Sequence, residues 1–156
     1  MPSDDSLSVG EALEQYFRDN GLSADTYTDR WVHLKMGPIP FAFPNTKGRI
    51  AAVKLHDLHH VATGYATSWV GEAEIGAWEV GAGCGRYYAA WVLNLSVMGL
   101  GMWISPRRVV RAFLRGRRSK TLYDRAFGDD LLALRVGELK AKLGLASVVH
   151  DRARSV

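Results

Sequence analysis

The chain has 156 residues, which suits one domain, and its 47% of apolar and 23% of charged residues exclude a disordered or fibrous protein. A single cysteine, Cys84, rules out an internal disulfide bond and fits a reducing compartment. The net charge of +4 is uneven, because residues 1–29 hold seven acids whereas residues 107–120 hold seven bases and no acid. The basic block favours an anionic partner or wide solvation, and the acidic start lacks the apolar run of a secretory signal.

The first elements are a helix and an extended segment. Ser8 and Glu11 have the spacing of a capping box, and Asn20-Gly21 is a typical helix end. Residues 30–36 alternate between apolar and polar side chains, which predicts a strand. Residues 37–45 are rich in proline, so they fit an edge strand or extended arm but not a helix.

Two helices are expected next. The first runs from about Thr46 to Thr63 and ends at Gly64, and the second runs from Trp69 to about Val80 with Ser68 as its cap. Three glycines break the second helix: Gly81, Gly83 and Gly85.

Residues 87–106 are uncharged and just reach the length of a membrane span. Tyr87 and Trp103 would suit the two interfaces of a bilayer, whereas Asn94 and Ser96 weaken that interpretation. The alternative is a helix buried in the domain or in a dimer interface.

Ser105-Pro106 then predicts the start of an amphipathic helix. Its apolar arc holds Val109, Val110, Phe113 and Leu114, and its basic arc holds Arg107, Arg108, Arg111 and Arg115. We expect the four arginines to contact a membrane surface, with a solvated basic face as the alternative.

A last helix is expected from Asp129, as its cap, to Leu143, with Gly144 as its stop. The predicted fold is mainly α: one helical domain over residues 1–156, with a small extended arm or β-hairpin near residues 30–44.

Histidines concentrate in the first long helix. His56 and His60 lie one turn apart on one face, and Asp57 falls on the flank of that face. The turn after Gly64 would fold the next helix back, so that Glu72 can reach the same place, with Glu79 one heptad further on. His59 points about 100° away and is not expected to be a ligand.

Imidazole and carboxylate groups bind divalent zinc, iron, manganese or cobalt, of which zinc fits this set best. We therefore predict a divalent-metal site formed by His56, Asp57, His60 and Glu72, with Glu79 supporting it from behind. The competing interpretation is a hydrogen-bonded core histidine beside a solvated acidic helix face.

The motif His56-Asp57-x-x-His60, eleven residues and then Glu72 resembles that of the coenzyme Q biosynthesis protein four family. The flanking Thr63-Gly64-Tyr65 and Gly71-Glu72 also resemble that family, and the similarity covers about residues 45–105. Residues 1–44 resemble the family's N-terminal helices poorly, and the chain is short for the family.

The resemblance implies a helical fold, a bound divalent metal and a peripheral place on the inner, cytoplasmic face of a membrane. It also implies work on a polyprenylated hydroxybenzoate or another isoprenoid lipid, in which a hydroxyl replaces the ring carboxyl by oxidative decarboxylation. His56, Asp57, His60 and Glu72 would then be catalytic as well as metal ligands. A homodimer or a quinone-synthesis complex is a possible assembly, and the alternative role is a non-catalytic lipid-binding scaffold with a structural metal.

Two further functions are weaker interpretations. A metal phosphohydrolase would need His33 together with Asp124 or Asp129 as additional ligands, and nothing local marks these residues. A nucleic-acid binder would use residues 107–120, but that block has few aromatics and follows an apolar helix. We therefore expect no nucleic-acid partner.

Overall fold

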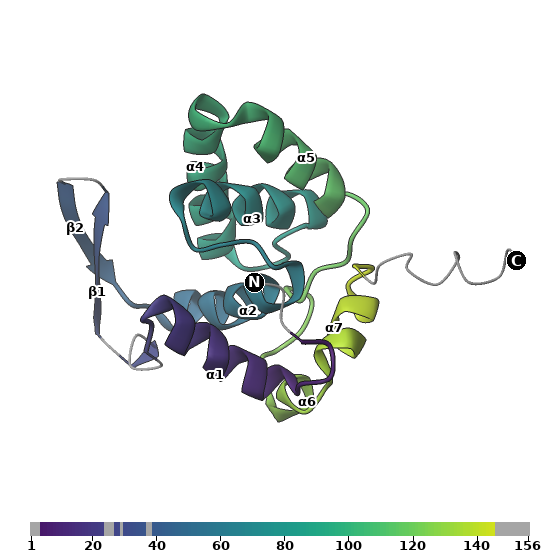
Figure 1. Cartoon of the computed structure of the whole chain (residues 1–156). Coiled ribbons are helices and arrows are strands. Elements are labelled where there is room, and N and C mark those ends of the chain that lie inside the picture. Colours follow the sequence, from purple (N-terminus) through teal and green to yellow (C-terminus); the bar gives the residue numbers. More distant parts are fainter. Residues whose placement is uncertain (1–3, 24–26, 29, 37–38, 146–156) are drawn as a thin grey trace, which may run out of the picture.

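The computed structural model describes residues 4–23, 27–28, 30–36 and 39–145. This part of the chain forms seven helices and a two-stranded sheet, which confirms the mainly α fold class (Figure 1). In Figure 1, α3, α4 and α5 lie together on one side of α2, and α1, α6 and α7 lie on the other.

The N-terminal elements follow the sequence closely. Helix α1 spans Val9–Asn20, and the Ser8–Glu11 capping box and a left-handed Gly21 define its ends. Strands β1 (Trp31–Met36) and β2 (Ile39–Pro44) form an antiparallel hairpin, which projects away from the helices in Figure 1. Residues 37–38, which connect the two strands, lie outside the described residues.

Helix α3 (Trp69–Ala82) has the predicted cap, Ser68, whereas Thr46, expected as the start of α2 (Lys47–Thr63), is its cap, and α2 ends at a left-handed Gly64. The turn between them packs tightly on the start of α3, because a Cβ atom at Gly71 would lie 2.0 Å from the carbonyl oxygen of Ala66. Only glycine fits there. Because Glu72 is the next residue, this close contact fixes the position of the Glu72 backbone.

Helix α3 continues through Gly81 to Ala82, so the predicted break at Gly81 is wrong, and Gly83 ends the helix. Gly81 instead lets α3 approach α5 (Pro106–Gly116): a Cβ atom at Gly81 would lie 2.4 Å from the carbonyl oxygen of Phe113. Its missing side chain therefore serves helix packing and does not end the helix.

Helix α4 spans Tyr88–Ile104, and it leaves most of its length exposed, since Ala90, Asn94 and Gly101 are its buried residues. Among the described residues, no helix combines the length and the apolar character that crossing a membrane requires. Ser105 precedes α5 and Pro106 occupies its first turn, but the Ser105 side chain makes no capping hydrogen bond.

The predicted helix over residues 129–143 is wrong in one respect, because it is two helices, α6 (Asp129–Leu132) and α7 (Val136–Lys142). Gly128, and not Asp129, occupies the capping position of α6. The break frees backbone groups for the N-terminal segment: the Val9 amide donates to Leu134 and the Val136 amide donates to Leu7. A tertiary contact therefore replaces one turn of helix.

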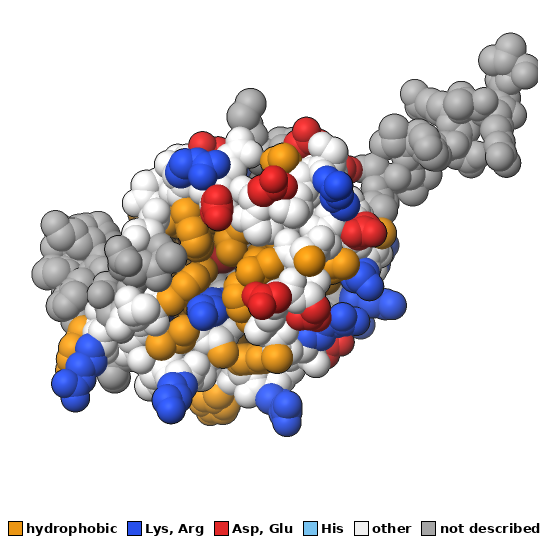
Figure 2. Space-filling view, turned by 90° about the horizontal axis from the view of Figure 1, so that it is seen from below, with side chains coloured by type: hydrophobic (Ala, Val, Ile, Leu, Met, Phe, Trp, Pro, Cys, Tyr) orange, Lys and Arg blue, Asp and Glu red, His pale blue; other side chains and the backbone are white. Residues whose placement is uncertain are grey.

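Helix α2 lies at the centre of the core, and every residue from Asp57 to Ala62 is buried. Figure 2 shows the face seen from below Figure 1, where hydrophobic side chains gather across the middle, with acidic and basic side chains between and around them. Charge of both signs is therefore interspersed on this face, and the excess of bases is not concentrated there.

Candidate metal centre

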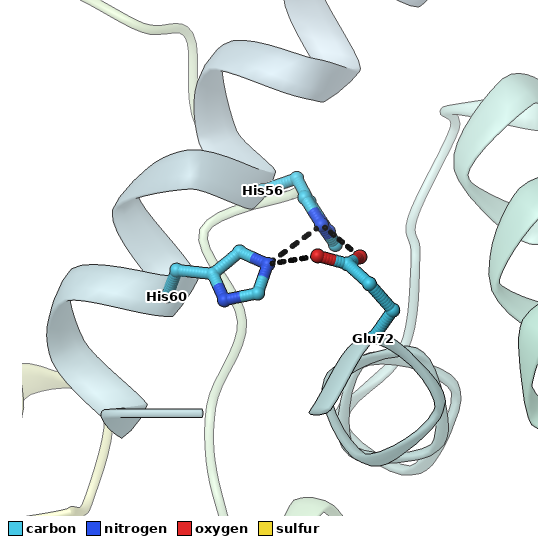
Figure 3. A group of neighbouring side chains, drawn as sticks. All are labelled: His56, His60 and Glu72. Atoms are coloured by element: carbon cyan, nitrogen blue, oxygen red, sulfur yellow. Dashed lines mark hydrogen bonds and ion pairs between the residues drawn. The ribbon is translucent and has the colours of Figure 1, made fainter. Parts of the chain in front are cut away.

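Three of the four predicted ligands converge between α2 and α3. His56 and His60 point from α2 toward the carboxylate of Glu72 on α3 (Figure 3). The two imidazole Nε2 atoms are 3.2 Å apart, and the Glu72 oxygens lie 3.5 Å from His56 Nε2 and 3.3 Å from His60 Nε2. Each residue can thus offer one ligand atom to a common point.

The opposite ring nitrogens of these histidines are already engaged. His60 Nδ1 lies 2.9 Å from the backbone carbonyl of Tyr65, and His56 Nδ1 lies 3.0 Å from Oε1 of Glu79. A carbonyl and a carboxylate can only accept, so both Nδ1 atoms carry the proton. When the rings are neutral, both Nε2 atoms present lone pairs toward Glu72, as in metal sites whose histidines are oriented from behind.

This arrangement fits a cation. With neutral rings, two imidazole lone pairs and a carboxylate face one another, so a positive charge, either a metal ion or a proton on His56, is needed between them. Ligand atoms around a tetrahedral zinc ion lie roughly 3.3–3.5 Å from one another, given zinc–ligand bonds of about 2.0–2.2 Å. The separation of 3.2 Å between the two Nε2 atoms is close to that spacing, and each Nε2 atom lies 3.3–3.5 Å from a different oxygen of Glu72.

The electrostatics of the site favour positive charge. Burial alone would lower the pKa of His56, but the carboxylates of Glu79 and Glu72 outweigh it and hold that pKa well above its usual value. Burial alone would raise the pKa of Glu72, but its contacts with His56 and His60 lower it to about 2. The same field that stabilises a proton on an imidazole stabilises a metal ion.

Glu79, the residue expected to support the ligands from behind, is fully buried and accepts four hydrogen bonds, one of them from the candidate ligand His56. Its Oε1 accepts from Nδ1 of His56 and Nδ1 of His59, at 3.0 and 2.6 Å, and its Oε2 accepts from Asn94 and, at 2.9 Å, from the Tyr123 hydroxyl. Burial alone would raise the pKa of Glu79, but these interactions hold it far below its usual range.

His59 is hydrogen-bonded through both ring nitrogens, one of which contacts Glu79. Its Nε2 accepts the backbone N–H of Leu122 at 3.0 Å, so its Nδ1 carries the proton that goes to Glu79. The imidazole is therefore neutral and fully hydrogen-bonded in the core, where its side chain is 0% exposed.

Asp57 lies close to the cluster but stands apart from it. The Tyr27 hydroxyl donates to Oδ2 of Asp57, and burial raises the pKa of this carboxyl above its ordinary value. Among the described residues, the one group of three or more residues whose potential ligand atoms all lie within 4.8 Å of one another is His56, His60 and Glu72. Asp57 as a fourth ligand therefore stays a prediction of the motif.

The N-terminal helix covers the site. The Tyr16 ring stacks on the His60 ring, with centroids 5.4 Å apart, and burial raises the pKa of the Tyr16 hydroxyl. His60 is 1% exposed at its side chain, whereas His56 and Glu72 are 20% and 31% exposed. Access to the cluster is therefore from the side of His56 and Glu72.

Two of the four arginines predicted to contact a membrane are bound within the protein. Arg108 forms a bidentate ion pair with Glu74, at 2.9 and 2.7 Å. Arg115 lies over the Tyr65 ring, with its guanidinium carbon 5.4 Å from the ring centroid. Arg107 and Arg111 are exposed and form no ion pair with any described residue.

The aspartates needed for a phosphohydrolase lie elsewhere. Asp124 lines a groove beside α4, and Asp129 begins α6, so neither belongs to the cluster. The side chain of His33 lies outside the described residues.

Sequence analysis missed several supporting residues. Asn94 gave a signal, because it is a lone amide in an apolar helix, and the structure explains it as a donor to Glu79. Tyr65 follows the predicted helix end and supplies the carbonyl for His60. Tyr123 lies 44 residues beyond Glu79, and no local pattern marks it.

Comparison of the chain with protein-family models, with curated proteins and with solved structures finds no match. What the fold and the site define is a mainly helical protein with a candidate metal centre of two histidines and one glutamate.

We predict that the purified protein binds about one divalent metal ion per chain at this centre. The substitutions His60→Ala and Glu72→Gln should each remove most of it, because each deletes one of three converging ligands. Elemental analysis after gel filtration measures the stoichiometry. Glu74→Gln is the matched control, two residues from Glu72 on α3 with its carboxylate turned to Arg108. Metal retained in His60→Ala at the wild-type level would contradict the site.

We predict that Glu79→Gln weakens metal affinity about 10–100-fold, because it frees the His56 ring that Glu79 orients. It should also destabilise the fold by about 1–3 kcal/mol for each donor left without an acceptor. Competitive chelator titration and denaturant unfolding measure the two effects. Asn94→Ala removes one donor to Glu79 and leaves both histidine contacts, so its effect on metal affinity should be smaller; equal losses would argue against an orienting role.

Proposed function

We propose that this protein is a metal-dependent, membrane-associated enzyme of ubiquinone biosynthesis. Its substrate in this proposal is a polyprenylated hydroxybenzoate, whose ring carboxyl at position 1 is replaced by hydroxyl. The resemblance of the motif is the reason for proposing this substrate and this reaction. The cluster of His56, His60 and Glu72 is the proposed site of the reaction.

The number of converging ligands is the observation that supports a catalytic role. Catalytic zinc sites have three protein ligands and keep a position for substrate or water, whereas structural sites use four. Here three ligand atoms converge, and the His56–Glu72 side of the cluster is partly exposed. A substrate carboxylate is the kind of group that can approach such a centre, and a bound metal would supply Lewis-acid polarisation of it.

The chain's own groups would orient that carboxylate and control protons near it. Replacing the ring carboxyl by a hydroxyl, with loss of carbon dioxide, removes two electrons from the substrate. Dioxygen would accept these two electrons with two protons and become hydrogen peroxide, and water would supply the oxygen atom of the new hydroxyl. Tyr16 and Tyr27 flank the cluster, and both hydroxyls have pKa values raised by burial, so they remain protonated donors.

Association with a membrane is proposed through α4 and α5. Val110 and Leu114 lie one turn apart on α5 and are 45% and 52% exposed, and Trp103 at the end of α4 is 91% exposed. Arg107 and Arg111 are exposed on the same helix. Exposed apolar side chains beside arginines are typical of a helix that lies in the headgroup region of an anionic bilayer.

We predict that the protein loaded with metal converts a prenylated 4-hydroxybenzoate under air in a single turnover, with release of about one equivalent of carbon dioxide. His60→Ala should lose this activity, whereas Glu74→Gln should keep it. Mass spectrometry of the lipid product and isotope counting of the ring carboxyl measure the reaction. If the protein binds the prenylated substrate but does not convert it with any tested metal, the result favours the non-catalytic scaffold.

We predict that the double variant Arg107→Gln/Arg111→Gln binds vesicles of anionic phospholipid roughly 30-fold more weakly, because each cation near the surface contributes about 1 kcal/mol. Co-sedimentation with vesicles measures the partition coefficient. Arg108→Gln should have a smaller effect, since its guanidinium is held by Glu74. Equal partition of wild type and double variant would contradict the proposed contact.

A further inference from the structure

A groove of about 1000 Å³ lies away from the metal cluster. The start of α2, the first two turns of α4 and the segment 123–126 line it. Its volume is that of a site for a molecule of drug or lipid size, since ligand pockets span roughly 300–1000 Å³.

One wall of the groove is apolar. Tyr88, Val92 and Leu93 belong to that wall, and their side chains are 82%, 52% and 36% exposed. Tyr88 and Val92 are one helical turn apart, so they form a continuous strip along α4. Three large side chains that bury so little of their surface within the protein form a surface that an apolar ligand can cover.

The opposite wall is held in place by tyrosines. The Tyr87 ring packs on the Tyr123 ring, with centroids 5.4 Å apart, and the Tyr87 hydroxyl donates to the carbonyl of Arg125 at 3.1 Å. These two contacts tie the segment 123–126 to the residue that precedes α4.

Arginines supply the charge of the groove. Arg86 and Arg125 line it, both are exposed, and neither forms an ion pair with any described residue. Arg49 also lines it and donates to Asn45 at 2.7 Å. Asp124 is the one acid in the lining, so the groove carries an excess of positive charge beside an apolar strip.

From this juxtaposition we infer that the groove binds an amphipathic anion, a single phosphate or carboxylate head on an apolar chain. Arg86 and Arg125 bind the head, because guanidinium groups form charge-assisted hydrogen bonds with either acid. The chain lies along Tyr88, Val92 and Leu93. A free phosphate would leave the apolar strip unused, and a neutral lipid would leave the arginines unused.

The groove is a site separate from the metal centre. None of the residues that line it belongs to the cluster of His56, His60 and Glu72. Tyr123 stands between the two, since it lines the groove and its hydroxyl donates to Glu79. The inference therefore does not depend on the proposed function and can be tested separately from it.

The test is binding of dodecyl phosphate and of dodecanoate, below their micellar concentrations, by isothermal titration of the full chain. We expect saturable binding of at least one of them with one site per chain. Two control probes should each bind at least about tenfold more weakly: dodecyl maltoside, which has the same chain on an uncharged head, and inorganic phosphate, which has no chain. Failure of both amphipathic anions to bind, or equal binding of either half-probe, overturns the inference.

Two pairs of variants locate the site. Arg86→Gln/Arg125→Gln should weaken binding at least about tenfold, whereas Arg117→Gln/Lys120→Gln, which removes the same charge from the exposed segment after α5, should not. Val92→Ser should weaken it, whereas Leu95→Ser, equally exposed at 52% but absent from the lining, should not. Helical circular dichroism and thermal unfolding verify that each variant is folded. Equal losses in a variant and its control overturn the placement.

Discussion

The buried carboxylate of Glu79 is the interaction on which the rest of this structure depends. It lies on α3 and receives two hydrogen bonds from α2, one from α4 and one from the segment that follows α5. An ionised carboxylate in a protein core is costly unless donors surround it, and here four do. Because the donors come from three other parts of the chain, satisfying one charge fixes how those parts meet.

The same carboxylate links the fold to the chemistry. By accepting the Nδ1 proton of His56, it leaves the Nε2 lone pair of that ring for a metal, and the Tyr65 carbonyl does the same for His60. The neighbouring His59 has a structural role, because both of its ring nitrogens form hydrogen bonds inside the core. Three histidines within five residues thus divide into two candidate ligands and one structural residue, by the partner each nitrogen finds.

The surface shows a similar division of apparently equivalent residues. Of the arginines on α5, Arg108 neutralises a carboxylate of α3 and Arg115 packs on Tyr65 near the end of α2, so both hold the helices together. Arg107 and Arg111 face solvent beside exposed apolar side chains. The basic block of the sequence is therefore divided between arginines that bind other parts of the protein and arginines that are exposed to solvent.

The sequence by itself determined the helices and their caps, because Ser8, Thr46, Ser68, Gly21 and Gly64 act through local hydrogen bonds and backbone conformation. It also placed His56, His60 and Glu72 together, since helical periodicity and a short turn suffice for that. Only the tertiary structure decided that Asp57 pairs with Tyr27, that residues 129–143 form two helices, and that Asn94 and Tyr123 support Glu79. These outcomes depend on contacts between residues 15 to 129 positions apart, where one partner's identity says nothing about the other until the chain has folded.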